Sequence, residues 1–498
     1  MKTKAITHNI LGSLSNFVFL FLTGILLLPY YFKFISTSEY GIWLGGISFL
    51  SLVSVFEANI SLILTQQLGN KWVNKKLDEF SKYFSAAIIF GLLVSIVIVF
   101  VTYFFKDMLT HWVTPSGAVN KSYSQSFFLY SIALSLTIIS GYLNSIPQVF
   151  LKTFWPPIFN LISSVFGIVY TLWAIPHQGI LALASGNLVK TLIYTILDFF
   201  YVLIILKKEQ IPFCVDVHYL FMLIKNIGLP FISKVGMTLA MSIQNFIVAT
   251  TISSSATTIF EITKKLPSLT VMIINMIAVS TFTSFSLFYS ESDNKGVVHD
   301  YTKHYFSLIR MMLVFTLLII FLIGQDFISI WVGLDKFGGN YLLSLICLTV
   351  FSDQLRMILS QQYYAIGKFN LTSITDSVFA VSFLVFALII MPIIGLEGIV
   401  IAGIGANLIY FISCAILEKR FHTDMVQYII TKNLLLDLSV VFLISGSAIL
   451  ILNQYRNSFF VLIITIALAA LLMAMFYYKR EVVLLKFIIS KFVRFPKK

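Results

Sequence analysis

Long hydrophobic runs separated by short polar segments extend along almost the whole chain. Six runs lie at residues 10–31, 40–68, 83–105, 126–150, 156–176 and 179–206, and eight more lie at 226–252, 256–287, 305–328, 341–366, 371–391, 393–416, 434–452 and 459–478. A helix of about 20 apolar residues crosses the hydrocarbon core of a bilayer. The pattern therefore predicts an all-α integral membrane protein with about 14 transmembrane helices.

The composition agrees with a membrane protein. Hydrophobic residues make up 58% of the chain and charged residues 11%, whereas soluble domains have about 45–50% and about 25%. The formal charge of +13 would suggest nucleic acid as a partner of a soluble protein. Here it does not, because an excess of Lys and Arg is typical of the cytoplasmic loops of membrane proteins.

The basic residues are unevenly divided between alternate loops. With the N-terminus inside, the cytoplasmic segments contain 23 Lys and Arg residues and the outer loops contain five. Basic loops stay on the cytoplasmic side of a membrane. We therefore expect a multi-pass protein with both termini in the cytoplasm.

The two groups of six spans resemble each other weakly. Ser36-Thr37-Ser38, before the second span, corresponds at an offset of 217 residues to Ser253-Ser254-Ser255, before the eighth. Chance similarity and a true duplication both explain such a match. A duplication would give two six-helix lobes around a central cavity, as in transporters built from repeats. The expected division is an N-terminal lobe at 1–206, a cytoplasmic connecting loop at 207–225, a C-terminal lobe at 226–418, two accessory transmembrane helices at 419–478 and a basic cytoplasmic tail at 479–498.

Some basic residues fall inside the predicted spans. They are Lys190, Lys234, Lys264, Lys265, Arg310 and Arg356. A charge at the centre of a membrane helix costs about 2.5–3.5 kcal/mol, so these side chains are expected to face protein or water and are candidates for function. Arg310 has a structural alternative to function, because it lies near the cytoplasmic end of its span and a long side chain there can reach the membrane surface.

Local acids give some of these residues a structural alternative. Asp353 lies three residues before Arg356, and Glu261 lies three and four residues before Lys264 and Lys265, so each acid shares a helix face with a base. These residues either neutralise one another or take part in a binding site. Lys190 and Lys234 have no acid at these spacings, and Glu57 has no local base.

Two arrangements account for the isolated charges. In one, Glu57 pairs with a lysine across helices; in the other, the charges line a water-filled cavity whose positive wall selects a phosphate or diphosphate. Lys suits phosphate because its compact ammonium group carries three rotatable donors. We favour the cavity, in which Lys190, Lys234, Lys264, Lys265 and Arg356 would bind phosphate and Glu57, Glu261 and Asp353 would be the cavity acids that couple transport to an ion.

Motifs of catalysis and metal binding are missing from the sequence. Gly367-Lys368 does not belong to an ATP-binding loop, because position 362 is Gln362 and not the glycine that this motif requires. The seven His residues have no metal-ligand spacing, and the predicted loops are too short to form a catalytic domain. We expect neither enzymatic activity nor a metal or cofactor site.

Five short motifs are similar to those of a known family. They are Phe56-Glu57-Ala58-Asn59, Ile262-Thr263-Lys264-Lys265-Leu266, Trp331-Val332-Gly333, Ala365-Ile366-Gly367-Lys368 and Gly395-Leu396-Glu397-Gly398. With them the chain resembles, over nearly its whole length, the O-antigen repeat-unit (Wzx-type) polysaccharide flippases of the multidrug/oligosaccharidyl-lipid/polysaccharide (MOP) exporter superfamily. It departs from that family at Asn59, where glycine is usual, and at Gln66-Gln67, where arginine is common.

The resemblance implies a carrier. It would move undecaprenyl-diphosphate-linked oligosaccharide, the repeat unit of O-antigen or capsule, from the cytoplasmic to the outer leaflet of a bacterial inner membrane by alternating access. Its partners would be membrane lipid, the polysaccharide polymerase and the chain-length regulator, and its energy would come from the membrane potential or from an H⁺ or Na⁺ gradient. A multidrug exporter of the same superfamily and a membrane polymerase or glycosyltransferase are the alternatives.

Overall fold

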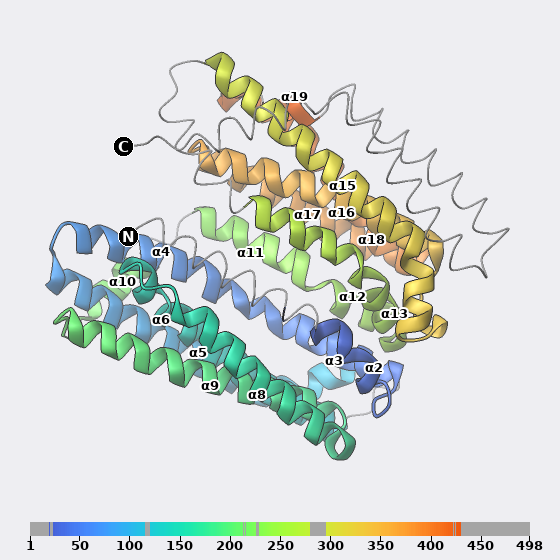
Figure 1. The fold of residues 1–498 in the computed structure, drawn as a ribbon, viewed down its shortest axis with the longest axis horizontal. Helices are drawn as coiled ribbons and strands as arrows, with labels where there is room; N and C mark the ends of the chain where they lie inside the picture. The colour runs from blue at the N-terminus through green and yellow to red at the C-terminus, as the bar shows by residue number, and fades with distance from the viewer. Residues whose placement is uncertain are drawn as a thin grey trace. The chain divides into compact units, whose positions relative to one another are not determined.

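The computed structural model describes residues 19, 23–114, 120–212, 214, 216–225, 229–278, 295–421, 423 and 425–429. All regular structure in these ranges is helical, which confirms the predicted all-α class (Figure 1). The chain packs as two compact units, Met1–Thr258 and Ile259–Lys498. Most of the expected first span, the spans expected at 434–452 and 459–478, and the tail at 479–498 lie outside the described residues.

Several helices have the length and composition of membrane spans. In the described ranges there are 8: Leu77–Val113, Lys121–Val149, Trp155–Gln178, Ile180–Lys208, Thr302–Trp331, Gly339–Ala365, Phe369–Ile394 and Leu396–Phe421. Large apolar side chains on their surfaces are exposed, among them Phe100, Trp173 and Leu388. Because lipid is the medium that accepts such a surface, the protein is a multi-pass membrane protein.

The first unit is a bundle of helices around four long ones. Its elements are α2 (Leu28–Tyr31), α3 (Thr37–Leu50), η1 (Ser51–Ser54), α4 (Val55–Val73), α5 (Leu77–Val113), α6 (Lys121–Leu143), α7 (Ser145–Val149), α8 (Trp155–Gln178), α9 (Ile180–Lys208), α10 (Val217–Lys225), α11 (Leu229–Ser242) and α12 (Gln244–Thr251). Of the four long helices, α6 packs against both α5 and α9, and α8 packs against α9, so the four form a layered body (Figure 1). α3 packs against α12.

The second unit begins within α13 (Ser254–Lys265). Its further elements are an apolar helix at Pro267–Ala278, α15 (Lys295–Trp331), η2 (Leu334–Lys336), α16 (Gly339–Ala365), α17 (Phe369–Ile394), α18 (Leu396–Phe421) and α19 (Val426–Ile429). α16, α17 and α18 pack on one another. The turn between α17 and α18 contains Gly395 at a φ of 85°, a conformation that glycine adopts at low cost.

Some of the predicted spans are interrupted helices. The span expected at 40–68 consists of α3 and α4 separated by the 3₁₀ turn η1, and the span expected at 226–252 consists of α11 and α12. α3 begins at a capping box, in which Glu39 N donates to Ser36 Oγ at 3.2 Å and Ser36 N donates to Glu39 Oε2 at 2.8 Å. Interrupted helices are common at the binding sites of transporters.

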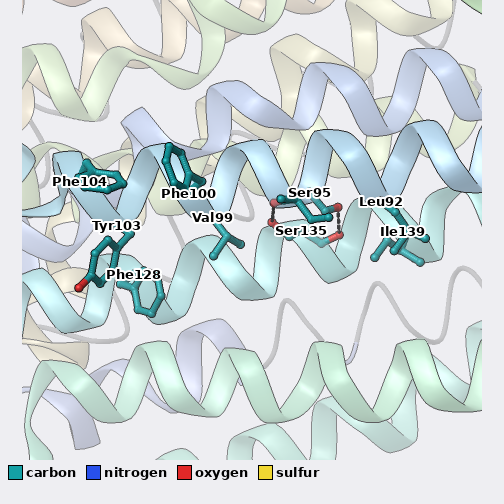
Figure 2. A pocket seen from close by; sticks show the side chains of 10 residues that line it. Leu92, Ser95, Val99, Phe100, Tyr103, Phe104, Phe128, Ser135 and Ile139 are labelled. Carbon is teal, nitrogen blue, oxygen red and sulfur yellow. Dashed lines mark hydrogen bonds between the residues drawn. The ribbon is translucent and has the colours of Figure 1, made fainter.

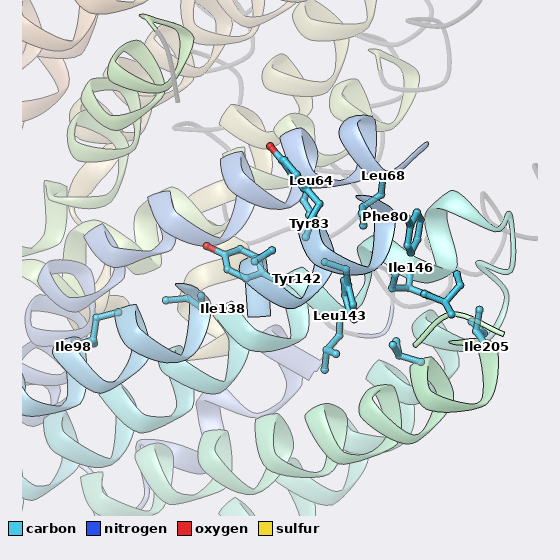
Figure 3. Packing of buried hydrophobic residues seen from close by; sticks show 14 residues of the cluster. Leu64, Leu68, Phe80, Tyr83, Ile98, Ile138, Tyr142, Leu143, Ile146 and Ile205 are labelled. Atoms are coloured by element: carbon cyan, nitrogen blue, oxygen red, sulfur yellow. The ribbon is translucent and has the colours of Figure 1, made fainter. Parts of the chain in front are cut away.

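Two hydrophobic clusters hold together the two ends of the first unit. One joins Leu64 of α4 to Tyr83 of α5, Tyr142 of α6 and Ile205 of α9 (Figure 3). The other joins α3, α5, α6, α8, α9 and α12 around Phe127. In a bilayer these clusters stabilise the bundle through close packing, since the surrounding lipid is as apolar as the side chains themselves.

Candidate functional site

Lys190 lies on α9 between the residues of the two clusters and is partly buried against α8. An added Cβ on Gly167 of α8 would lie 2.7 Å from Lys190 Cβ, and one on Gly186 would lie 1.8 Å from Thr171 Oγ1. Small residues therefore let α8 and α9 approach closely at this level. In the part of the chain that the structure describes, the Lys190 ammonium group has no hydrogen bond or ion pair.

Two lysines that lie outside the spans of the same unit are paired, in contrast to Lys190. Lys71 Nζ lies 2.8 Å from Glu79 Oε2. Lys152 Nζ lies 2.7 Å from Glu209 Oε1. Polar loops have acids available for such pairs, whereas a cation inside a span without one requires water or an anionic ligand. Lys190 is therefore the strongest candidate contact for an anion in this unit.

Asp198 is a further ionisable residue of α9, and it was not among the candidates predicted from the sequence. It is fully buried at 0% exposure, and neither carboxylate oxygen has a hydrogen-bond partner among the described residues. It does not neutralise Lys190, because eight residues of helix separate the two by about 12 Å along the axis. A lone acid within the apolar run 179–206 was the available signal.

Arg356 is held in a polar cluster between α16 and α18. Its Nε donates to Asn407 Oδ1 at 2.9 Å, and its Nη2 lies 3.4 Å from Asp353 Oδ1. The guanidinium carbon lies 3.9 Å from the centre of the Phe379 ring on α17. The predicted pair of Asp353 and Arg356 is therefore present, and with its side chain 3% exposed Arg356 has the surroundings of a structural pair.

Two further hydrogen bonds lie beyond Arg356 along α16. Ser360 Oγ donates to Asp376 Oδ2 at 3.3 Å, and Tyr363 OH donates to Glu418 Oε1 at 2.7 Å. Asp376 and Glu418 are buried acids that were not among the candidates predicted from the sequence. Both could have been found in the sequence, because Asp376 lies inside an apolar run and Glu418 lies at the end of one. These hydrogen bonds connect α16 to α17 and α18, and they are favourable in a low-dielectric interior.

The remaining candidates lie on α13, α4 and α11. Glu261, Lys264 and Lys265 occupy the last two turns of α13, and all three side chains are partly buried. Lys264 Nζ lies 5.4 Å from the centre of the Phe260 ring. Glu57 lies on α4 and Lys234 on α11, where their side chains lie outside the described part of the structure.

Arg310 does not reach the membrane surface. Its side chain is 2% exposed, so the expectation of a surface-reaching arginine was wrong. The reason is that α15 packs against α16 and α19 within the second unit, so a side chain on its packed side is enclosed by protein.

A polar contact joins α3 to the start of α13 within the first unit. Ser38 Oγ and Ser254 Oγ lie 2.8 Å apart, and Thr258 Oγ1 donates to Thr37 O at 2.7 Å. An added Cβ on Gly41 would lie 1.6 Å from Ser254 O, so the two backbones are in direct contact. We call these residues the α3–α13 contact. The basic-residue distribution predicts that it faces outward.

Comparison with solved structures identifies the fold. The lipid II flippase MurJ in its inward closed conformation matches with a TM-score of 0.68 at 16% identity, over 94% of this chain and 98% of that chain. An inward-facing multidrug resistance MATE family transporter of the MOP superfamily matches with a TM-score of 0.62 at 15% identity, over 77% of this chain and 93% of that chain. The Vibrio cholerae MATE transporter VcmN matches with a TM-score of 0.58 at 10% identity, over 86% and 97%.

The chain has the fold of these transporters. No protein-family model matches it, and no curated protein matches its sequence. At these identities the likeness defines the architecture, and what the chain carries has to be argued from its own residues.

Proposed function

We propose that the protein is a flippase that moves an undecaprenyl-diphosphate-linked oligosaccharide, an O-antigen or capsule repeat unit, from the cytoplasmic to the outer leaflet of a bacterial inner membrane. The observation that carries the proposal is Lys190, an ammonium group within a membrane helix that pairs with no described acid. A diphosphate supplies the negative charge that this site lacks. The O-antigen class of substrate rests on the five family motifs.

The phosphate-binding residues in this account are Lys190, Lys234, Lys264 and Lys265. Arg356 has a structural role, because its donors are already directed at Asp353 and Asn407. Glu57 and Glu261 would be the acids that couple transport to an ion. The membrane potential is the simplest energy source, since moving one charge across 100 mV is worth about 2.3 kcal/mol and an anionic headgroup moves outward with an inside-negative potential.

Alternating access requires a contact that closes one side and then opens. We take the α3–α13 contact as this contact, because it consists of two serine hydroxyls, a threonine and a close glycine approach. Such hydrogen bonds contribute about 0.5–1.5 kcal/mol each. A contact of this strength can open within a transport cycle.

A multidrug exporter is the second candidate, supported by the likeness to MATE transporters. The charge at position 190 distinguishes the two functions. An exporter of cationic drugs would be impaired by a lysine in its binding cavity, whereas an anion carrier depends on it. Lys190→Glu should therefore abolish transport of an anionic substrate and spare or improve export of cationic dyes.

The experiment that tests the function uses a deletion strain of the native host. We expect loss of surface polysaccharide and accumulation of single lipid-linked repeat units facing the cytoplasm. Wild-type protein should restore the polymer, and Lys190→Ala should not. If single units reach the outer leaflet normally in the deletion strain, the proposed function is wrong. Collapsing the membrane potential in vesicles tests the energy source, because unchanged outward flipping would exclude the potential.

A further inference from the structure

A groove of about 660 Å³ opens on the surface of the first unit between α5 and α6 (Figure 2). Its walls are apolar and include Val99, Phe100 and Phe104 of α5 and Phe128 of α6. Phe100 and Phe104 are each 63% exposed. On a helix that crosses the membrane, side chains exposed to this extent lie against lipid, so the groove opens toward the hydrocarbon.

Two serines at the floor of the groove donate to backbone oxygens. Ser95 Oγ donates to Ser135 O at 3.1 Å, and Ser135 Oγ has two acceptors, Ser131 O at 2.9 Å and Ser95 O at 3.3 Å (Figure 2). With both hydroxyls engaged, the floor offers no free donor to a polar ligand. The groove is therefore suited to a hydrocarbon chain.

The length of the groove matches one leaflet. Leu92 and Phe104, which line its two ends, are twelve residues apart on α5, or about 18 Å along the helix. One leaflet contributes about 15 Å of the hydrocarbon thickness. The apolar run of this helix extends from 83 to 105. The groove therefore lies along the C-terminal half of that run.

A cation lies where the groove ends. Lys106 Nζ lies 4.4 Å from the centre of the Tyr103 ring and 5.5 Å from that of Phe128, and both rings line the groove. Within the described ranges no acid forms an ion pair with Lys106, including its neighbour Asp107. The two rings hold the ammonium group in place by cation–π attraction and leave its donors available.

We propose that this groove binds one acyl chain of an anionic phospholipid and that Lys106 binds the lipid phosphate. The apolar walls, the length of one leaflet and the cation at headgroup level together match this ligand. A polyprenyl chain fits less well, because its extended length exceeds the groove. The inference concerns the lipid-facing surface and does not depend on the substrate that the protein carries.

The test is lipid binding by the purified full-length protein, followed by native mass spectrometry. The probes are phosphatidylglycerol, which is anionic, and phosphatidylcholine, which is neutral overall. Wild-type protein should retain one phosphatidylglycerol with about tenfold preference, a difference of about 1.4 kcal/mol. Lys106→Gln should lose the preference. Lys33→Gln is the matched control, because Lys33 also lies over a tyrosine ring, 5.9 Å from the centre of Tyr30, but outside the groove.

Filling the groove tests the acyl chain separately from the phosphate. Val99→Trp should abolish retention of both lipids, and Ile96→Trp, at a position 64% exposed and therefore tolerant, is the second filling variant if the first fails to fold. Equal binding of both lipids by the wild type, or an unchanged preference in Lys106→Gln, overturns the proposal. Displacement of phosphatidylglycerol by polyprenyl phosphate at equal concentration also overturns it and assigns the groove to a polyprenyl tail.

Discussion

Ser38 and Ser254 are joined by their hydroxyl groups at 2.8 Å, although 216 residues separate them in sequence. At the repeat offset of 217, Thr37 corresponds to Ser254 and Gly41 corresponds to Thr258. Gly41 contacts Ser254, and Thr258 contacts Thr37. Each contact is therefore the repeat equivalent of the other. A two-fold relation between repeats produces such reciprocity. The contact supports duplication, which the sequence alone left open.

Replacing Lys190 should remove transport without unfolding the protein. Lys190→Ala deletes a cation that no described acid neutralises. If the ammonium group binds a phosphate, transport should fall at least about tenfold, because a hydrogen bond to a charged group is worth about 1.5–3 kcal/mol. The measurement is the rate of flipping of a lipid-linked oligosaccharide in vesicles.

Lys208→Ala is the matched control for this experiment. Lys208 lies on the same helix, α9, but is exposed in its last turn. We expect its transport rate to stay within about twofold of the wild type, because surface charges contribute little. Equal rates for Lys190→Ala and the wild type would exclude Lys190 as a phosphate contact.

Replacing Arg356 should destabilise the protein. Arg356→Ala leaves the buried Asn407 and the partly buried Asp353 without the donor that they share; breaking a fully buried pair costs about 3–5 kcal/mol, which is the upper bound here. Chemical or thermal unfolding in detergent measures the loss. Lys336→Ala, which removes the ion pair with the largely exposed Asp335, should cost less than about 1 kcal/mol. Wild-type stability of Arg356→Ala together with lost transport would instead make Arg356 a substrate contact.

Enlarging Gly186 should separate α8 from α9. A Cβ at this position would lie 1.8 Å from Thr171 Oγ1, so Gly186→Ala forces the two helices apart or displaces the threonine. Such overpacking costs about 1–3 kcal/mol. Thr171→Ala in the same protein should restore part of the stability, and Gly69→Ala, whose Cβ meets nothing within 4 Å, should cost little. If the stability losses of Gly186→Ala and Thr171→Ala simply add in the double variant, the two residues do not clash and this packing is wrong.

The lengths of the apolar runs in the sequence predicted most of the membrane-spanning helices. A run of about 20 apolar residues has few alternatives to a membrane helix, and the described spans follow the runs closely. The interruption at Ser51–Ser54 was not predicted, because its residues Ser51-Leu52-Val53-Ser54 are compatible with a continuous helix and packing selects the turn. The burial of Arg310 was also not predicted, because it depends on how α15 packs against its neighbours.

The candidate site was only partly predictable. Spacing along one helix predicted the pair of Asp353 and Arg356, because residues three apart share a face. Asn407, which completes the cluster, is 51 residues from Arg356, and no local pattern identifies such a partner. Asp198 was missed although a lone acid in an apolar run is visible in the sequence, because its burial depends on how α9 packs.

The central claim, that the protein carries a lipid-linked anion by alternating access, is tested most directly by locking the α3–α13 contact. Ser38→Cys and Ser254→Cys place two thiols where the hydroxyls lie 2.8 Å apart. Cys214→Ser provides the background, since Cys347 and Cys414 are buried. Ser140→Cys with Thr195→Cys is the matched control, because those hydroxyls lie 2.7 Å apart between α6 and α9, which stay packed in our account.

The measurement is flipping of an undecaprenyl-diphosphate-linked oligosaccharide by each cross-linked protein in vesicles. Our account predicts that oxidation stops flipping in the protein with Ser38→Cys and Ser254→Cys, that reduction restores it, and that the control pair flips at the same rate in both states. If the protein with its α3–α13 disulfide fully formed flips the substrate as fast as the same protein with the disulfide reduced, the account is wrong.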